Sequence, residues 1–139
     1  MIAFDTDVLT GILVGNAGLV ERAAKIPIDD QTVPVIVIEE ILRGRLNVIR
    51  QAEALRARVS LVRAYELFEQ TFRDFERLHI LSYASEAESL FQEWRQQGIR
   101  ISTHDLRIAA ICVAHSARLL SRNRRDFERV PGLIVEFWD

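Results

Sequence analysis

Short apolar runs alternate with helical stripes along this chain, and the first pair sets the pattern. Residues 2–4 form an apolar run that ends abruptly in Asp5, as expected for a buried strand. From Val8 onward, apolar residues recur on one face of a helix, which Asp5 or Thr6 is placed to cap. We therefore expect Asp5 where a buried strand gives way to a helix.

The second apolar run, residues 33–38, is rich in β-branched residues and predicts a second buried strand. Pro34 is tolerable there, because a proline near the start of a strand removes little of its hydrogen bonding. A short helix at 19–26 precedes this strand, and a helix running through Gly44 toward Arg50 follows it. The second strand therefore also delivers acidic residues at its carboxyl end.

The rest of the chain continues the alternation. Residues 51–78 predict one long amphipathic helix, or two helices that meet near residues 59–60. The later elements are a strand at 79–81, a helix at 85–97 capped by Ser85 and stopped by Gly98, a helix opened by residues 102–105, a strand at 119–121, a polar loop or short turn at 122–127 and a closing strand at 133–138. This order predicts one α/β domain over residues 1–139, with a parallel sheet of about four or five strands flanked by helices on both faces.

Composition places the chain among ordinary globular proteins, with 49% hydrophobic and 27% charged residues in 139. That length can bury a core without metal or disulfide cross-links. The one cysteine, Cys112, lies in an apolar run, where we expect a small buried side chain rather than a disulfide. No apolar run approaches the roughly 20 residues that span a bilayer. Because the first residues also lack the basic segment of a signal peptide, we expect a cytoplasmic protein that does not bind membranes.

The formal net charge of −2 gives no global attraction toward nucleic acid, but the choice of cation is informative. Lys25 is the only lysine among 18 Lys and Arg residues, so the other 17 are arginine. Arginine is well suited to bidentate contact with phosphate and to stacking on bases. Many of these arginines are nevertheless expected to pair with glutamates on exposed helix faces.

Four acids share one place in this pattern, at or near the junctions that follow the predicted strands or open the helices. They are Asp5, Glu40, Asp105 and Asp126. In a parallel sheet these junctions meet at one edge, where carboxylates held together repel one another and lose hydration. A divalent cation removes that penalty, and all-oxygen ligands favour Mg²⁺ or Mn²⁺. The chain has no Cys-x-x-Cys or His-Glu-x-x-His motif that would favour zinc.

Simpler interpretations of these acids stay open. Asp5 can be only the cap of the first helix, and Asp105 stands three residues after Ser102, the spacing of a capping box. His104 beside it is expected to be exposed next to the cap rather than catalytic. His115, late in the same helix, is expected to be structural.

The other two acids also have alternatives. Glu40 can be a solvated glutamate that favours the helix dipole, and we expect that role still more for Glu39. Asp126 can be a loop acid that pairs with Arg124 or Arg125. One acid alone is weak evidence, whereas the repeated set favours a metal site.

Four stretches of the chain resemble, in order, the motifs of PIN domains. Phe-Asp-Thr-Asp-Val-Leu at 4–9 resembles their opening, Glu-Ile-Leu-Arg-Gly at 40–44 is similar to the second motif, and Asp-Leu-Arg-Ile-Ala-Ala at 105–110 to the third. The fourth motif and tail of VapC-type toxins resemble residues 119–127, 130–133 and 138. The resemblance covers essentially the whole chain. Ser121 stands where the family more often has Thr, which keeps the hydroxyl, and either Asn123 or Asp126 completes the fourth motif.

The resemblance implies a Mg²⁺- or Mn²⁺-dependent endoribonuclease that acts on single-stranded or looped RNA. Such proteins are often toxins held by a small antitoxin, and they are commonly homodimers. The implied catalytic and metal-binding residues are Asp5, Glu40, Asp105 and Asp126, supported by Thr6, Ser121 and Asn123, with Arg122, Arg124 and Arg125 on the RNA backbone. The helix that contains Phe68–Phe75 and the closing strand are both candidates for the dimer face.

Two other classes of function fit parts of the pattern. A PIN-like RNA-binding or scaffold module would keep the fold without chemistry, although such proteins tend to lose one of the acids. Asp5-Thr6-Asp7 also fits the opening of D-x-D phosphatases, but these, like phospho-switch domains, need a late lysine. Lys25 lies early in the chain, so we expect Asp7 to cap the helix or to steady Asp5.

Overall fold

Five short strands form one fully parallel sheet in the computed structural model, which describes residues 1–139. The strands are β1 (Ile2–Phe4), β2 (Gln31–Pro34), β3 (His79–Leu81), β4 (Arg118–Ser121) and β5 (Val135–Phe137). Their order across the sheet is β3-β2-β1-β4-β5, so β1 is central and β3 and β5 are the edges. The predicted α/β class, parallel sheet and strand number are confirmed.

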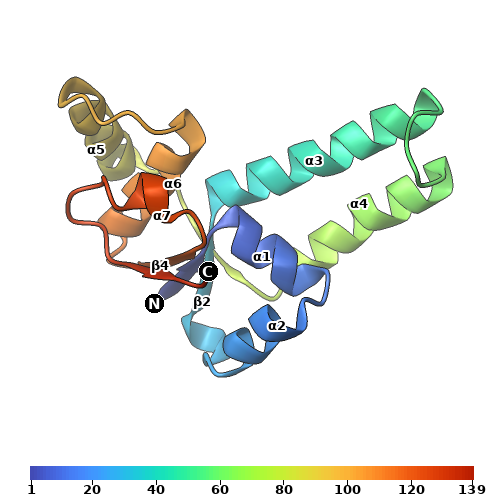
Figure 1. The fold of residues 1–139 in the computed structure, drawn as a ribbon, viewed down its shortest axis with the longest axis horizontal. Helices are drawn as coiled ribbons and strands as arrows, with labels where there is room; N and C mark the ends of the chain where they lie inside the picture. The colour runs from blue at the N-terminus through green and yellow to red at the C-terminus, as the bar shows by residue number, and fades with distance from the viewer.

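Helices cover the sheet on both faces, as expected. They are α1 (Thr6–Leu13), α2 (Ala17–Ala24), α3 (Val35–Glu53), α4 (Leu61–Phe75), α5 (Ser85–Gln96), α6 (Thr103–Ala114) and α7 (Arg124–Phe127), with a 3-10 turn at Ile28–Asp30. Consecutive residues of a strand point to opposite faces, and Leu119 and Leu120 of β4 are both buried. Figure 1 shows α5–α7 on one side of the sheet and α1–α2 on the other.

The second strand is shorter than predicted, because the chain turns into α3 immediately after Pro34. Pro34 is the last residue of β2 rather than an early one, and its φ of −62° and ψ of 139° place it at the helix N-cap. The first helical turn lacks partners for its N–H groups, so a proline there costs little. Ile36 and Val37 are buried in the core as parts of the helix, and this burial outweighs their preference for strands.

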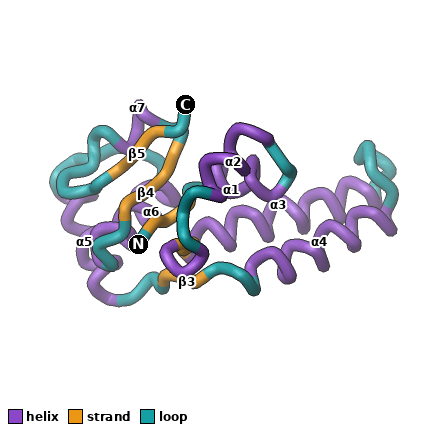
Figure 2. Tube along the Cα trace, turned by 90° about the horizontal axis from the view of Figure 1, so that it is seen from below, coloured by secondary structure: helices purple, strands orange, loops and turns teal.

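The segment at 51–78 forms two helices, which decides between the two alternatives. Chain reversal between α3 and α4 occurs over residues 54–60, and the two helices form a hairpin that projects beyond the sheet (Figures 1 and 2). A separate small apolar cluster of Ile49, Ala52 and Ala64 holds the hairpin together. Its aromatic stripe is divided, since Phe75 is buried whereas Phe72 is 48% exposed.

Two further local predictions differ from the structure. Ser85 is the first residue of α5 rather than its cap, and the cap residue Ala84 makes no side-chain bond to the helix. The polar segment at 122–127 contains the short helix α7. By contrast, Gly98 ends α5 with a φ of +82°, a conformation that favours glycine.

The main core lies between the sheet and the two helical layers. Phe4, Leu106, Ile108 and Leu119 are among its fully buried side chains. Cys112 is buried and free, as expected, and burial raises the pKa of its thiol. None of the helices combines the length and the apolar character needed to cross a membrane.

Candidate active site

Asp5 lies at the carboxyl end of the central strand and is also the N-cap of α1. The register of β1 and β4 pairs Phe4 with Leu120, which brings the next residues, Asp5 and Ser121, side by side. The Ser121 hydroxyl donates to Asp5 Oδ2 at 2.6 Å, and the Thr6 N–H donates to Asp5 Oδ1 at 2.8 Å. Only 5% of Asp5 is exposed. The capping role and the position at the sheet edge are therefore both present in one side chain.

Burial makes the negative charge of Asp5 costly. Loss of hydration raises the pKa of Asp5 to about 6 from an ordinary 3.8, against the lowering effect of the hydrogen bonds from Ser121 and Thr6. The charges of Asp105 and Asp7 raise the pKa further. The prediction that Asp7 caps the helix or steadies Asp5 is wrong, because Asp5 is itself the cap and Asp7 repels it.

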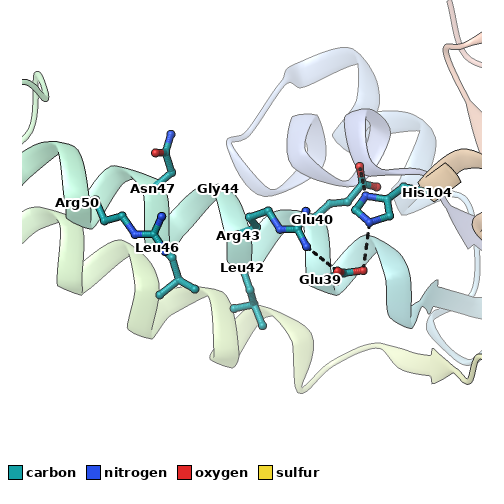
Figure 3. Close-up of a pocket in the computed structure, with 9 residues that line it drawn as sticks. All are labelled: Glu39, Glu40, Leu42, Arg43, Gly44, Leu46, Asn47, Arg50 and His104. Atoms are coloured by element: carbon teal, nitrogen blue, oxygen red, sulfur yellow. Dashed lines mark hydrogen bonds and ion pairs between the residues drawn. The ribbon is translucent and has the colours of Figure 1, made fainter. Parts of the chain in front are cut away.

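Glu40 joins this edge from the second turn of α3, since the helix begins earlier than predicted. The Thr6 hydroxyl donates to Glu40 Oε1 at 2.7 Å. His104 lies between two glutamates, with Nδ1 at 3.6 Å from Glu40 Oε2 and Nε2 at 3.5 Å from Glu39 Oε1 (Figure 3). Its side chain is 24% exposed, so the expectation of an exposed histidine beside the cap is wrong. Glu39 also pairs with Arg43 at 2.8 Å and is not merely solvated.

Asp105 and Asp126 are joined by Asn123 from the loop after β4. The Asn123 side-chain NH₂ donates to Asp126 Oδ2 at 3.0 Å and to Asp105 Oδ2 at 3.3 Å, while its backbone N–H donates to Ser121 Oγ at 3.0 Å. Ser102 caps α6 by accepting from the Asp105 N–H at 3.2 Å. Neither neighbouring arginine pairs with Asp126. Both candidates for the fourth motif therefore lie beside Asp105, and which of them completes the motif stays a prediction.

Electrostatic repulsion ties Asp105 to the other acids. Partial burial raises its pKa, a hydrogen bond from Ser102 to the carboxylate side chain lowers it, and the charges of Glu40, Asp126 and Asp7 raise it. Asp105 in turn raises the pKa of Asp5. The four predicted acids thus meet at one edge of the sheet, at a cost that a bound cation would relieve.

The three predicted RNA-contacting arginines differ in their surroundings. Arg124 pairs with Asp139 at 3.3 Å and with Glu128 at 3.4 Å, so its charge is already used within the chain. Arg122 and Arg125 are exposed and form no ion pair. His115 fits its structural role, since its Nε2 lies 3.1 Å from the carbonyl of Ser82.

Donor chemistry at this edge fits Mg²⁺ or Mn²⁺, because its carboxylates, hydroxyls and amide supply oxygen atoms. The structure contains no group of three or more His, Cys, Asp or Glu side chains arranged to hold a metal ion by themselves. Mg²⁺ is commonly held by only one or two carboxylates and keeps several of its waters. The site fits an ion bound partly through water, and direct ligation by all four acids stays a prediction.

Sequence reasoning missed Glu39 and His104 as members of the site. Their spacing carried two signals, since Glu39 stands four residues before Arg43 and His104 directly precedes Asp105. Neither signal reveals that α3 and α6 meet at this point.

Two curated ribonucleases of Rickettsia felis are similar to this chain. Ribonuclease VapC1 is 32% identical over 100 residues, which cover 72% of this chain and 70% of VapC1. Ribonuclease VapC2 is 36% identical over 67 residues, so that alignment spans half of VapC2 and 45% of this chain. No protein-family model matches the chain.

Solved structures share the fold along essentially the whole chain. The complex VapBC2 of Rickettsia felis bound to a promoter DNA fragment matches with a TM-score of 0.76 at 22% identity, covering 100% of both chains. FitAcB of Neisseria gonorrhoeae matches with a TM-score of 0.80 at 19% identity, covering 97% of this chain and 96% of that one. DNA-bound VapBC of Salmonella typhimurium gives 0.74 at 20% identity, covering 100% of both chains.

These structural matches establish the fold, and the VapC1 alignment carries the relationship in sequence. With 32% identity across more than two thirds of each chain, this chain belongs to the VapC family of PIN-domain ribonucleases.

Proposed function

We propose that this chain is a Mg²⁺- or Mn²⁺-dependent endoribonuclease that hydrolyses phosphodiester bonds in single-stranded or looped RNA. The observation that most supports this proposal is that the Asp5 carboxylate is buried close to Asp105 although their negative charges repel each other. Such an arrangement costs stability and is typical of a site that binds a cation.

The chain's own residues have separable tasks in this proposal. Asp5 and Asp105 hold the ion, while Glu40 and Asp126 act directly or through water. Ser121 positions Asp5, because its hydroxyl is already donated to that carboxylate. Asn123 positions the two acids that it bridges. The divalent ion, when bound, supplies positive charge that neutralises the phosphate and activates water.

Arg122 and Arg125 contact the RNA backbone outside the acid cluster. Both are exposed and free of ion pairs, so their guanidinium groups are available to phosphate oxygens. Arg124 is the weaker candidate of the three predicted arginines, since Asp139 and Glu128 already neutralise it.

The position of Lys25 speaks against the phosphatase alternative. Lys25 lines a cleft with Ile2 and Arg118, the first residues of β1 and β4. The side chain of Gln31, the first residue of β2, donates to the carbonyls of Ala23 and Ile26. Lys25 stands between those two residues, so it lies near the amino end of β2 and away from the carboxyl edge that holds Asp5. A lysine there cannot balance the charge of a phosphorylated Asp5. The presence of all four acids separately argues against a catalytically silent binding module.

Cleavage of a mixed-sequence single-stranded RNA with Mg²⁺, with Mn²⁺ and with EDTA tests the function. We expect the wild type to cleave only with a divalent ion, and Asp5→Asn to lose at least a hundredfold in rate. Asp29→Asn is the matched control, because Asp29 is an exposed acid in the turn that precedes β2. Equal activity of the wild type and Asp5→Asn, or no activity in a folded wild type, would refute the proposal.

We also propose that the chain is the toxin of a type II toxin–antitoxin pair. The support is its family and its likeness to the toxin folds in the VapBC complexes. Expression of the chain alone should arrest growth of a bacterial host, and co-expression of a small protein encoded beside it should restore growth. Growth arrest should be absent with Asp5→Asn.

A homodimer is the third part of the proposal, with α4 and the edge strand β5 as its two candidate faces. Phe75 is excluded as a contact because it is buried in the core, whereas Phe72 and Val62 of α4 are exposed. Sedimentation velocity of the wild type and Phe72→Glu separates the faces. A dimer that dissociates in Phe72→Glu assigns α4, and an unchanged dimer leaves β5 as the assignment.

A further inference from the structure

A cleft begins at Glu40, one of the four acids, and follows α3 away from the other three. It has a volume of about 810 Å³, and six of its nine lining residues are charged or polar. Glu40 and His104 form the end nearest the site, while Asn47 and Arg50 lie farther along the helix (Figure 3). The rise of 1.5 Å per residue separates Glu40 from Arg50 by roughly 15 Å along the helix axis. This is a groove on the scale of several nucleotides.

Charge along the groove changes from acidic to basic with distance from the site. Arg43 is paired with Glu39, but Arg50 forms no ion pair and is exposed. Figure 3 shows the Arg50 side chain extending along the helix toward the end that holds Glu40. The Asn47 side chain is exposed and makes no hydrogen bond within the chain. A free guanidinium binds phosphate, and a free carboxamide can read a base edge.

Gly44 is the feature that packing within the chain does not explain. It lies within α3, one turn after Glu40, where glycine is less favourable than alanine. A Cβ added at Gly44 would meet no atom within 4 Å, so no neighbour requires its absence. Gly44 and Glu40 also line a second cleft of about 310 Å³ between α1 and α3, next to Thr6. The bare backbone at Gly44 therefore forms a low ridge between two clefts that both reach the site.

We propose that a single strand of RNA crosses α3 at Gly44, next to the acid cluster, and continues along the α3 groove with Asn47 and Arg50 as specificity-determining contacts. This inference rests on the proposed ribonuclease function and names the path of its substrate. Absence of a side chain at Gly44 lets the sugar–phosphate chain approach the helix backbone closely. The unpaired guanidinium of Arg50 and the unpaired carboxamide of Asn47 match the phosphates and base edges of a nucleic-acid strand rather than the apolar face of a partner helix.

Gly44→Ala tests the crossing because stability and activity should change in opposite directions. Alanine should raise the melting temperature by roughly 2–4 °C, since it favours the helix and meets no neighbour. Cleavage of single-stranded RNA should nevertheless fall about tenfold in kcat/KM. The control is Ser89→Ala, at an exposed position of α5, which should stabilise without changing cleavage.

Arg50→Gln and Asn47→Ala test the groove beyond the crossing. Arg50→Gln should weaken RNA binding about tenfold and reduce its salt dependence, whereas Asn47→Ala should change which sequences are cleaved. Arg77→Gln is the matched control, because Arg77 is an exposed arginine just before β3, at the amino end of that strand, whereas the acids lie at the carboxyl ends of the strands. It should leave both properties unchanged.

Binding of a fluorescent 20-nucleotide RNA, measured in the Asp5→Asn background, separates this inference from the proposed function. Loss of binding in Gly44→Ala and Arg50→Gln supports the RNA path even if the wild type does not cleave. Cleavage and binding equal to the wild type in both variants would overturn the proposed RNA path but leave the ribonuclease proposal intact. The same conclusion follows if the two variants weaken only the capture of a protein partner. A wild type that neither binds nor cleaves RNA would overturn both.

Discussion

Replacing Asp5 with Asn should stabilise the folded protein at neutral pH while abolishing its activity. Asn is nearly isosteric with the neutral form of the acid and can still accept the Thr6 N–H bond. It removes a buried negative charge that Asp105 and Asp7 repel. The prediction thus tests directly whether the site sacrifices stability for function.

Its magnitude follows from the pKa of Asp5. A rise from 3.8 to about 6 on folding corresponds, at about 1.4 kcal/mol per pKa unit, to about 3 kcal/mol. The folded state binds this proton more tightly than the unfolded state, so protonation favours folding. The contribution of Asp5 is therefore most favourable below pH 4 and is lost as the pH rises to 6. Asp5→Asn should be more stable by about 2–3 kcal/mol at pH 7.5 and by much less at pH 4.

Urea unfolding followed by circular dichroism, in EDTA at pH 7.5 and pH 4, measures this difference. Comparing the two proteins at each pH isolates Asp5 from the other acids, including Asp105. Adding Mg²⁺ at pH 7.5 should stabilise the wild type more than Asp5→Asn, because ligand binding favours the folded state. Asp29→Asn should change stability by less than about 0.5 kcal/mol at either pH.

Two outcomes would refute this reasoning. One is an Asp5→Asn protein that is no more stable than the wild type at pH 7.5, since the charge of Asp5 would then cost nothing. The other is a stability difference of equal size at pH 4 and pH 7.5. That result would show a change in packing rather than the loss of a titrating charge.

Three other substitutions test the surroundings of the site and the core. Ser121→Ala should lower the free energy of unfolding by about 1.5–3 kcal/mol at pH 7.5 in the wild type but by much less in Asp5→Asn, because the Ser121 hydroxyl donates to a charged carboxylate. Urea unfolding in both backgrounds measures this coupling, and equal losses of free energy would contradict it. Thr6→Val should lower RNA cleavage about tenfold while the melting temperature changes little, since it removes the bond to Glu40; unchanged cleavage would mean that this bond does not position the acid. Cys112→Ser should cost about 1–3 kcal/mol in urea unfolding, because a hydroxyl replaces a fully buried thiol, whereas Cys112→Ala serves as the apolar control.

Much of the fold could be predicted because strands and helices differ in the period of their apolar positions. Runs such as residues 2–4 and 119–121 end in polar residues, and the helical stripes between them require a parallel sheet. The start of α3 could not be placed in this way. Residues 35–38 are β-branched and apolar, so their sequence fits a strand as well as a buried helical turn, and packing against the core decides.

Some features of the candidate site could likewise be predicted from local sequence, and others could not. Sequence alone indicated which acids stand at strand ends and helix starts, since that depends on local order. Asp5 was predicted as both a cap and a candidate ligand for this reason. The connections between acids join elements far apart in the chain, as when Ser121 donates to Asp5 across 116 positions. No local pattern encodes such a contact.

The sequence by itself determined the sheet class and the caps at Asp5 and Ser102, and it predicted the acid set, because each depends on neighbours within a few residues. Only the tertiary structure decided that His104 lies between Glu39 and Glu40, that Arg124 is neutralised by its neighbours, and that Gly44 forms a bare ridge beside the site. These features depend on how α3 and α6 meet and how the chain end returns to α7. The strand register and the packing of the core fix that geometry.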